Sequence, residues 1–443
     1  MARLAWFSPV PPVRSGIAAC SADLLGALGG DHEIDVFVDE PVVGRAPGTR
    51  SAHDFVWRHR QRPYDLTVYQ IGNSSHHDYE WPYLLRYPGL VVLHDVQLHH
   101  ARAAALLRQG RADAYRREFH WDHPDVSPDL AELAVSGFDN QLYYNWPMTR
   151  LLVEASRHIA VHSQHAADRL REETPAGPPI DVIRLGHGTA LSDDERQAAR
   201  ARGRARLGLP ADGLVFGCFG GLSPDKRIPQ VLTAFASTLT AVPSARLLLA
   251  GAPADHLDLK AEIKRRGIGS RTIVTGYVES DERLTEYIAA CDASLTLRWP
   301  TAGELSGPWL RCLALGLPTV IVDLAHLAHV PALDPRTWQV HGGATGSPVC
   351  IAVDILDEDH SLHLAMRRLA GHPALRAKLG QAAADFWQGE HSVERMVEDY
   401  RALIRRALDS PMPTPSWPHG LLDDGGSVLE GVTEAFGLPP VLR

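Results

Sequence analysis

The stretch "LVFGCFGGLSPDKRIPQVLTAFA" (214–236) decides the fold that the sequence predicts. Its apolar run 214–219 is typical of a buried strand, and the run ends at two glycines, Gly220 and Gly221. Apolar residues then recur at helical spacing, and Pro229 suits the first helical turn, where its missing N–H costs nothing. Strand, glycines and helix in this order predict a right-handed βαβ unit of a parallel sheet.

The same alternation runs through most of the chain. Strand-like runs lie at 3–7, 34–38, 65–70, 89–94 and 157–163, and again at 214–219, 245–251, 271–276, 292–297 and 319–323. A polar, arginine-rich stretch at 191–210 separates the two series and marks a break near 186–212. We therefore expect an α/β protein with two doubly wound, Rossmann-like parallel-sheet domains that face a central cleft.

Composition excludes several classes of function. The net charge of −9 argues against broad nucleic-acid binding, which needs a basic surface. Five cysteines without a close pair favour a reducing, cytoplasmic location over a disulfide framework or a zinc site. No window approaches the roughly 18 apolar residues of a membrane span, and no basic amphipathic helix is evident, so we expect at most peripheral membrane contact.

Lys226 is the first candidate for a functional residue. It is one of four lysines in a chain with 40 arginines, and it lies just before a helix N-terminus, where the helix dipole disfavours a cation. An anion bound between the two would reverse that penalty, and a compact ammonium on a flexible stem suits a diphosphate. A solvated surface lysine is the alternative.

Two further strand exits show the same chemistry. Gly16 follows the first strand and a proline-stiffened loop, and it precedes a helix; an anion site and a simple tight turn are equally good interpretations. In "LRWPTAGELSGPWLRCLALGLP" (297–318), Glu304 stands beside glycines before a helix, where it could accept hydrogen bonds from sugar hydroxyls. The N–H groups of Leu305, Ser306 and Gly307 could add donors. Alternatively, Glu304 only complements a helix dipole.

His94 and Asp95 end a strand of the first domain and face the expected crevice, where Asp95 could orient His94 or accept a proton as a general base. Asp95 could instead be a helix N-cap. His162 and Ser163 also close a strand and are weaker candidates. The histidine groups 76–77, 99–100 and 120–123 lack companion ligands at reliable spacing, so we expect no metal site. The D-x-D at 357–359 fits the start of a helix better than a metal site.

Lys226, Glu304 and the motifs around them resemble the corresponding residues and motifs of GT-B glycosyltransferases of the retaining family-4 type (glycosyl transferases group 1). The resemblance covers about residues 1–408 and is carried by "SPVPPVRSGIA", "GLVVLHDVQLHH", "IAVHSQHAADRL", "VIRLGHG", "FGGLSPDKRIPQVLTAFA", "LLLAGAP", "VTGYVESDERLTEYIAACD" and "PTAGELSGPWLRCLALGLP". It implies an acceptor-binding domain at 1–188, a nucleotide-sugar-binding domain at 189–388 and a helix at 389–410 that crosses back. Residues 411–443, rich in proline and glycine, are expected to form a peripheral tail.

The resemblance also implies roles for residues. Lys226 corresponds to the family's diphosphate-binding lysine, Gly16 to its N-terminal glycine loop, and Glu304 to the first glutamate of its paired-glutamate motif. Tyr277 and Val278 stand where the nucleobase is held, and His94 matches a histidine near the donor sugar. Gly220 and Gly221, with the 305–307 backbone, complete the expected donor site.

Two positions depart from the family pattern. Gly221 lies in the region where the family often has an arginine. Arg311 stands in place of the second glutamate, which usually holds the ribose, and the spacing from Glu304 is one residue short. Arg311 could face a phosphate or pack structurally, so the donor's identity stays open.

The resulting hypothesis is a metal-independent glycosyltransferase without a cofactor. It would move a sugar from a nucleotide-diphosphate sugar to an acceptor hydroxyl with retention, in polysaccharide or glycoconjugate biosynthesis. A GT-B nucleotide-sugar isomerase or epimerase and a non-catalytic nucleotide-sugar-binding protein are the alternatives. Sugar, base, acceptor (carbohydrate, lipid-linked or other) and oligomeric state are not specified by the sequence.

Overall fold

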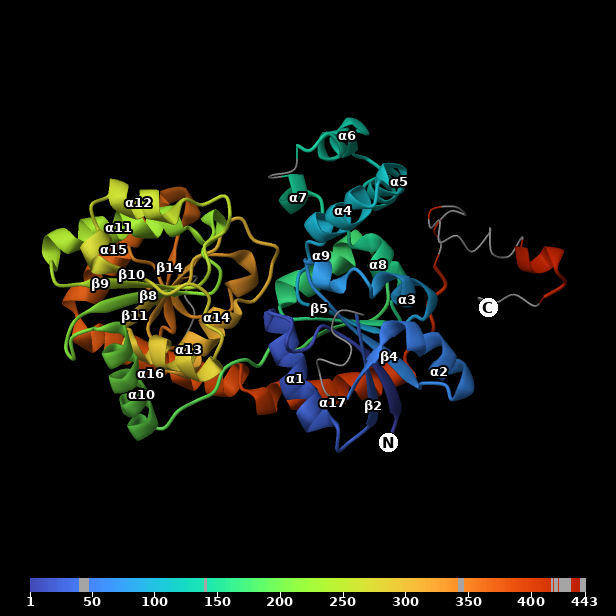
Figure 1. The fold of residues 1–443 in the computed structure, drawn as a ribbon, viewed down its shortest axis with the longest axis horizontal. Helices are drawn as coiled ribbons and strands as arrows, with labels where there is room; N and C mark the ends of the chain where they lie inside the picture. Colours follow the sequence, from blue (N-terminus) through green and yellow to red (C-terminus); the bar gives the residue numbers. More distant parts are fainter. Residues whose placement is uncertain are drawn as a thin grey trace. The chain divides into compact units, whose positions relative to one another are not determined.

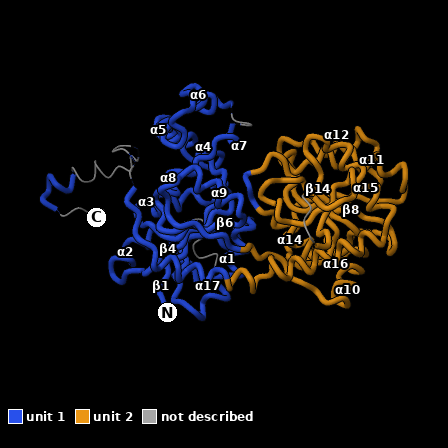
Figure 2. The backbone as a smooth tube through the Cα atoms, turned by 180° about the vertical axis from the view of Figure 1, so that it is seen from behind, with its two compact units in different colours: residues 1–183, 302–304, 399–443 blue, residues 184–301, 305–398 orange. Residues whose placement is uncertain are grey.

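The computed structural model describes residues 1–39, 48–138, 142–341, 346–415, 417, 421 and 432–438. The chain divides into two compact units, coloured separately in Figure 2. Unit 1 comprises residues 1–183, 302–304 and 399–443, and unit 2 comprises residues 184–301 and 305–398. The division therefore falls five residues before the expected boundary at 188. The short segment Ala302–Glu304 also belongs to the first unit.

Unit 1 is built on a parallel sheet with seven strands in the described residues, in the order β3-β2-β1-β4-β5-β6-β7 (Figure 1). The strands are β1 (Arg3–Phe7), β2 (Glu33–Val38), β3 (Thr49–Ser51), β4 (Leu66–Ile71), β5 (Leu90–Leu93), β6 (His158–Val161) and β7 (Ile180–Val182). The helices are α1 (Gly16–Leu28), α2 (Phe55–Gln61), α3 (Trp81–Arg86), α4 (His99–Arg108), α5 (Ala112–Asp122), α6 (Asp129–Val135), α7 (Leu142–Asn145), α8 (Arg150–Ala155), α9 (Gln164–Glu173) and most of α17 (Val393–Asp409).

Alternation along the strands gives the sheet of unit 1 two apolar faces. On one face, the ring of Phe7 packs against Phe37, Tyr69 and Phe55, with ring centroids 5.0–5.2 Å apart. On the other face, Trp6 lies 6.0 Å from Tyr400 of α17, measured between ring centroids. The C-terminal helix is therefore part of the core of unit 1.

Unit 2 repeats this winding in the described residues, with the strand order β10-β9-β8-β11-β12-β14-β13. Its strands are β8 (Val215–Phe219), β9 (Arg246–Ala250), β10 (Thr272–Val274), β11 (Ala293–Leu295), β12 (Thr319–Val322), β13 (Ala332–Leu333) and β14 (Cys350–Val353). Its helices are α10 (Asp193–Leu207), α11 (Ile228–Ala241), α12 (Leu259–Arg265), α13 (Asp281–Ala290), α14 (Gly307–Ala314), α15 (Glu358–Gly371) and α16 (Pro373–Glu390).

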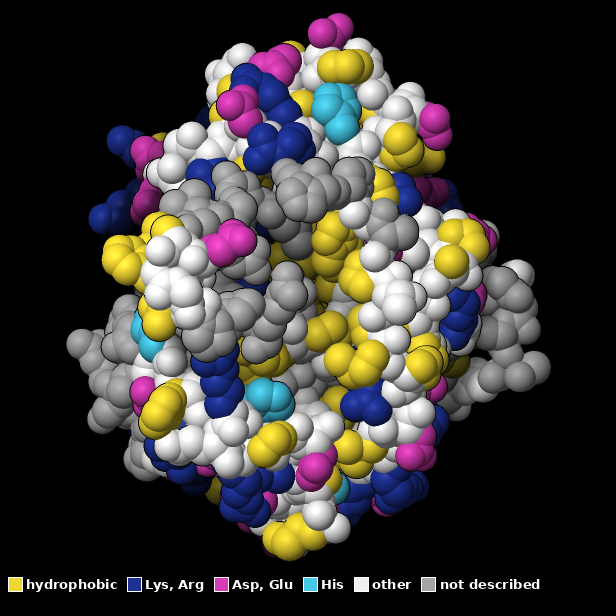
Figure 3. Space-filling view, turned by 90° about the vertical axis from the view of Figure 1, so that its right-hand side faces the viewer, with side chains coloured by type: hydrophobic (Ala, Val, Ile, Leu, Met, Phe, Trp, Pro, Cys, Tyr) yellow, Lys and Arg dark blue, Asp and Glu magenta, His cyan; other side chains and the backbone are white. Residues whose placement is uncertain are grey.

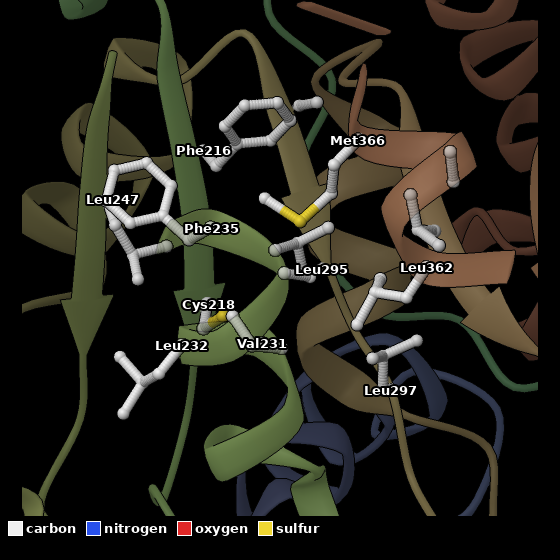
Figure 4. Packing of buried hydrophobic residues seen from close by; sticks show 14 of the residues in the cluster. Phe216, Cys218, Val231, Leu232, Phe235, Leu247, Leu295, Leu297, Leu362 and Met366 are labelled. Atoms are coloured by element: carbon white, nitrogen blue, oxygen red, sulfur yellow. The ribbon is translucent and has the colours of Figure 1, made fainter. Parts of the chain in front are cut away.

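The core of unit 2 lies between β8, β11, α11 and α15. Figure 4 shows Phe216 and Leu295 of the strands facing Phe235 and Met366 of the helices, and all four are at most 3% exposed. Helices α11, α12 and α15 cover one face of this sheet, and α10, α13, α14 and α16 cover the other (Figure 1). This core holds the carboxyl ends of β8 and β11 side by side.

Three parts of the chain differ from the sequence expectations. The stretch near 186–212, expected as a break, contains the capped helix α10, whose Arg200 and Arg204 pair with Asp292 in front of β11. Strands β3, β7, β13 and β14 lie outside the expected runs. In the expected peripheral tail, residues 416, 418–420, 422–431 and 439–443 lie outside the described residues, whereas Leu421 is buried against the core of unit 1.

Candidate functional site

The carboxyl ends of β8 and β11 flank the point in unit 2 where the strand order reverses, which is where open α/β sheets bind ligands. After β8 the chain turns at Gly220, whose φ of +87° favours glycine. A Cβ atom at Gly220 would lie 2.9 Å from Nζ of Lys226 and 3.2 Å from Cγ of Pro308. The Lys226 ammonium therefore lies over Gly220, beside the first turn of α14.

The backbone around Lys226 is firmly held. Lys226 ends the 3₁₀ turn η4 (Pro224–Lys226), and its N–H donates to the carbonyl of Ser223. Arg227 follows in the left-handed region with φ +56°, and α11 begins at the next residue. Gly221 has open space for a Cβ atom, so packing within the described residues does not require glycine there.

The loop after β11 lies against this turn. The N–H of Trp299 donates to the carbonyl of Asp225 at 2.7 Å, which joins the β8 and β11 exits. Ser306 caps α14 by accepting from the N–H of Trp309, and Leu305, Ser306 and Gly307 are half-buried. Unit 2 thus gathers Gly220, Lys226 and the N-terminus of α14 at its strand-order reversal. A cation beside free helix N–H groups can bind an anion.

Glu304 lies with residues of unit 1. Its Oε2 accepts from the N–H of Ala302 at 2.8 Å, and the carbonyl of Ala302 accepts from the N–H of Val96 at 3.1 Å. Gly303 has φ +81°, and a Cβ atom there would lie 2.8 Å from Cγ2 of Val96. The Gly-Glu pair is therefore fixed against the loop that follows β5 and Asp95.

Arg311 has partners that the sequence did not indicate. Its Nε donates to Nε2 of His187 at 2.9 Å, and its Nη2 lies 3.1 Å from Oδ1 of the exposed Asp281. His187 lies under Gly307, and burial, followed by the Arg311 charge, lowers its pKa to about 4. Gly188, with φ +97°, leaves room for Arg311. A histidine in a "GHG" turn after a strand was the only available signal for this arrangement.

The remaining donor-site candidates of unit 2 lie after β10. Gly276 has φ +69°, and the side chain of Tyr277 is 47% exposed. Val278 is half-buried against the cluster that contains Phe219. An exposed aromatic ring at a strand's carboxyl end can receive a ligand without displacing the core.

In unit 1, His94 follows β5 and is almost entirely buried. Its Nε2 lies 2.8 Å from Oε1 of Gln70, and its Nδ1 lies 3.2 Å from Nε2 of His162. Burial, followed by the proximity of His162, lowers the pKa of His94 well below its usual value. His94 is therefore neutral near pH 7, and both of its ring nitrogens have protein partners.

Asp95 follows β5 and Gly16 follows β1, the strands on either side of β4. Oδ2 of Asp95 accepts from the N–H of Asn73 at 2.6 Å. Helix α1 begins at Gly16, Ser15 caps it, and a Cβ atom on Gly16 would have open space. Ser163, like Ser15, is a helix N-cap, here of α9.

The histidine groups have structural partners. His77 contacts Glu80 at 2.9 Å, and His99 contacts the carbonyl of Trp146 and the hydroxyl of Tyr115. Across the described ranges, no group of three or more His, Cys, Asp or Glu side chains could hold a metal ion. Glu358 of the D-x-D stretch is buried and pairs with Arg227. Nor does any described helix have the length and apolar character needed to cross a membrane.

The fold of this chain is similar to the folds of several solved glycosyltransferase structures. The two parallel sheets with flanking helices form the GT-B fold, as the sequence predicted. Sucrose-phosphate synthase from Thermosynechococcus elongatus matches with a TM-score of 0.62 and 16% identity over 92% of this chain and 99% of that chain. HepE from Anabaena, in complex with UDP-glucose, matches with a TM-score of 0.59 and 15% identity over 92% of this chain and 100% of that chain. WaaG, a glycosyltransferase involved in lipopolysaccharide biosynthesis, matches with a TM-score of 0.57 and 14% identity over 90% and 99%.

Sequence comparison gives a narrower match. Residues 200–330 match the family model described as "Glycosyl transferases group 1". These residues include Lys226, Glu304 and Arg311. The D-inositol 3-phosphate glycosyltransferase of Nocardioides sp. (strain ATCC BAA-499 / JS614) is 25% identical over 289 residues, which are 58% of this chain and 57% of the relative. The match thus spans little more than half of that relative's length.

Proposed function

We propose that the protein is a glycosyltransferase that moves a sugar from a nucleotide-diphosphate sugar to an acceptor hydroxyl with retention of configuration. The observation that carries the proposal is the position of the Lys226 ammonium, over Gly220 and beside the first turn of α14. Positive charge and helix N–H groups meet there at the strand-order reversal. The family match over residues 200–330 supports the same activity.

Lys226 and the N-terminus of α14 would bind the diphosphate and stabilise the charge that develops on it. Such stabilisation is usually the largest catalytic term in group transfer. Glu304 would accept hydrogen bonds from donor-sugar hydroxyls, and Tyr277 with Val278 would hold the base. Arg311 supplies a cation where the resemblance has a carboxylate. Gly16 and Gly221 would allow close approach of the donor to the backbone.

Retention follows from a front-face substitution. The bond between the anomeric carbon and the leaving phosphate oxygen breaks while the acceptor oxygen bonds to the same face of that carbon. The acceptor's proton goes to the leaving diphosphate, so neither a metal nor a protein nucleophile is needed. His94, neutral because it is buried, would serve as a hydrogen-bond partner of the substrate rather than as the base. Asp95, after the same strand, would contact the acceptor hydroxyl.

Donors with uracil are the first to test, because HepE was solved with UDP-glucose and with UDP. A reducing, cytoplasmic location belongs to the proposal. It is supported by the five cysteines, all of which lie in the described ranges and are buried.

Donor hydrolysis and transfer assays with Lys226→Ala test the function directly. We expect kcat/KM to fall at least about a hundredfold, the scale of losing one preorganised charge stabiliser. Lys260→Ala, an exposed lysine on α12 of the same unit, is the matched control and should keep full activity. Wild-type turnover in Lys226→Ala would refute the site.

Product analysis without an acceptor separates the alternatives. A nucleotide-sugar isomerase or epimerase converts the donor without any acceptor, whereas a transferase releases nucleoside diphosphate and needs a hydroxyl. A non-catalytic binding protein would show donor-induced thermal stabilisation with no turnover. Glu304→Ala should abolish transfer, and Glu282→Ala, an exposed carboxylate on α13, should not.

A further inference from the structure

A chain of buried polar side chains links the C-terminal helix to His94. Gln70, His94 and His162 lie at the carboxyl ends of the adjacent strands β4, β5 and β6, and Tyr400 comes from α17. Oε1 of Gln70 lies 2.8 Å from Nε2 of His94 and 3.2 Å from the hydroxyl of Tyr400. At the other end, Nδ1 of His162 lies 3.2 Å from the carbonyl of Ile183.

Hydrogen counting along this chain selects one arrangement. A neutral imidazole has one N–H, and a carbonyl oxygen only accepts. Because the Ile183 carbonyl must accept, Nδ1 of His162 carries its hydrogen and Nε2 of His162 is an acceptor. Nδ1 of His94 must then carry the hydrogen that faces His162. Nε2 of His94 is left as an acceptor that needs a donor from Gln70.

The side chain of Gln70 can supply that donor. Its amide nitrogen, as placed, is buried and has no hydrogen-bond partner among the described residues. A half-turn of the amide exchanges nitrogen and oxygen. Both amide hydrogens then find acceptors, the ring of His94 and the hydroxyl oxygen of Tyr400, which as placed donates to Gln70. The half-turn leaves the carbonyl oxygen of Gln70 without a donor and the hydroxyl hydrogen of Tyr400 without an acceptor among the described residues. It removes two unsatisfied amide hydrogens and the contact between two acceptors, Nε2 of His94 and Oε1 of Gln70.

We propose that Gln70, Tyr400 and His162 are positioning residues that hold His94 in its Nδ1–H tautomer, as a hydrogen-bond donor toward the substrate. The inference rests on the proposed function, because it assigns His94 a partner in glycosyl transfer. Nε2 of His162 satisfies the Nδ1–H of His94 when no substrate oxygen does. The α17 helix, through Tyr400, fixes the amide of Gln70 and hence the ring.

The surroundings favour neutral rings. Burial lowers the pKa of His94 well below its usual value and that of His162 to about 4. The other titratable groups near His94 include His77 of the turn η3 (Ser75–His77), Tyr400 and the neighbouring Asp95, whose Oδ2 accepts from the N–H of Asn73. Cys20 of α1 lies near Tyr400. Burial keeps His77, Tyr400 and Cys20 uncharged near pH 7. A carboxylate in place of Gln70 would be the first charged group in this row of hydrogen-bonded side chains.

Gln70→Glu is therefore the informative variant. It has almost the same shape, but an ionised carboxylate accepts a hydrogen from Nε2 of His94 and stabilises the imidazolium. We expect kcat to fall roughly tenfold, the scale of one misdirected hydrogen bond, with the donor KM changed less than twofold. The pH profile of kcat should gain an ionisation that wild type lacks. Tyr400→Phe, a milder change, should lower kcat about threefold.

Tyr69→Phe is the matched control, because its hydroxyl donates to the carbonyl of Tyr87 on the opposite face of the sheet. It should leave kcat and the pH profile unchanged. Unchanged kcat and pH profile in both Gln70→Glu and Tyr400→Phe would overturn the proposal, provided that thermal melts show both variants folded.

Nitrogen-15 spectra of histidine-labelled protein test the tautomer without substrate. The His94 signals are those lost in His94→Gln. We expect a protonated Nδ1 and a bare Nε2 in wild type and the reverse, or a doubly protonated ring, in Gln70→Glu. A protonated Nε2 in wild type would refute the arrangement. If wild type shows the expected tautomer but transfers no sugar, the proposed glycosyltransferase function is wrong, whereas the assignment of the His94 tautomer is confirmed.

Discussion

Arg227 and Glu358 form a two-pronged ion pair in unit 2. Nε of Arg227 donates to Oε1 of Glu358 at 2.7 Å, and Nη2 donates to Oε2. Arg227 follows Lys226 directly and has a backbone conformation that non-glycine residues rarely adopt, and Glu358 is 7% exposed at the start of α15. The pair thus holds the backbone next to the candidate phosphate-binding ammonium.

Glu358→Gln should weaken donor binding without touching the donor. Loss of one charge from the pair leaves Arg227 partly unsatisfied, at a cost of about 1–3 kcal/mol in unfolding free energy. Because the left-handed Arg227 is then less firmly held, Lys226 loses its fixed position, and we expect roughly tenfold weaker binding of nucleoside diphosphate. Calorimetric titration and thermal melts measure the two effects.

Glu286→Gln serves as the control for that variant. Glu286 is a buried carboxylate of α13 whose arginine partners, Arg202 and Arg206, lie on α10. It should cost similar stability while binding of the nucleoside diphosphate stays at the wild-type level. Equal loss of affinity in both variants would mean that general destabilisation, and not the position of Lys226, weakens binding.

Gly220→Ala tests the contact between the glycine turn and the ammonium. The added methyl group would lie 2.9 Å from Nζ of Lys226, and the backbone φ of +87° adds strain of about 1–2 kcal/mol. We expect the ammonium to shift and transfer activity to fall at least roughly tenfold. Gly208→Ala carries comparable strain, with φ +64° and open space for the methyl group. If the two variants are equally active, Gly220 is not part of the donor site.

Arg311→Gln probes the position where the family resemblance leads one to expect a carboxylate. The change removes the donor to buried His187 and the partner of Asp281. We expect about 1–3 kcal/mol lower stability, because a buried acceptor loses its hydrogen bond. Asp281→Asn should change stability by less than about 1 kcal/mol, since Asp281 is exposed. Urea unfolding distinguishes these outcomes, and equal costs would contradict the central role of His187.

The sequence was sufficient for the fold. The pattern alone paired Lys226 with the N-terminus of the helix that follows it, α11, and only the family resemblance placed Gly220, Lys226 and the 305–307 backbone in one expected donor site. The spacing of apolar residues and the positions of glycines are local features, and the carboxyl ends of parallel strands meet at one edge of the sheet because of its topology. The sequence could not show the partners of Arg311 and His94. Those partners, His187, Asp281, Gln70 and Tyr400, lie far from them in the sequence. Helix α10 was missed as an element because its outer face is polar throughout, so that it gives no apolar stripe. Its capping box at Ser192 and Glu195 was the signal that could have found it.

The pH dependence of stability offers a test of the buried histidines. Burial lowers the pKa of His99 in the folded protein to about 4, below the value of about 6.5 for an unfolded chain. Between these values the unfolded state binds more protons, so the contribution of His99 to stability is complete above pH 6.5 and is lost as the pH falls toward 4. Glu80 and Asp122, whose pKa values burial raises, act in the opposite direction.

Comparison of wild type with His99→Gln at each pH cancels the carboxyl contributions. At pH 7.5 the variant should be less stable, because it loses the ring's contacts with Trp146 and Tyr115. Below pH 6.5 the difference in unfolding free energy should shrink by up to about 1.4 kcal/mol for each pH unit, because only wild type pays to keep this ring neutral. Urea unfolding at pH 7.5, 6.5 and 5.5 measures that slope. A difference that stays constant over this range would show that His99 has the same pKa in the folded and unfolded chains.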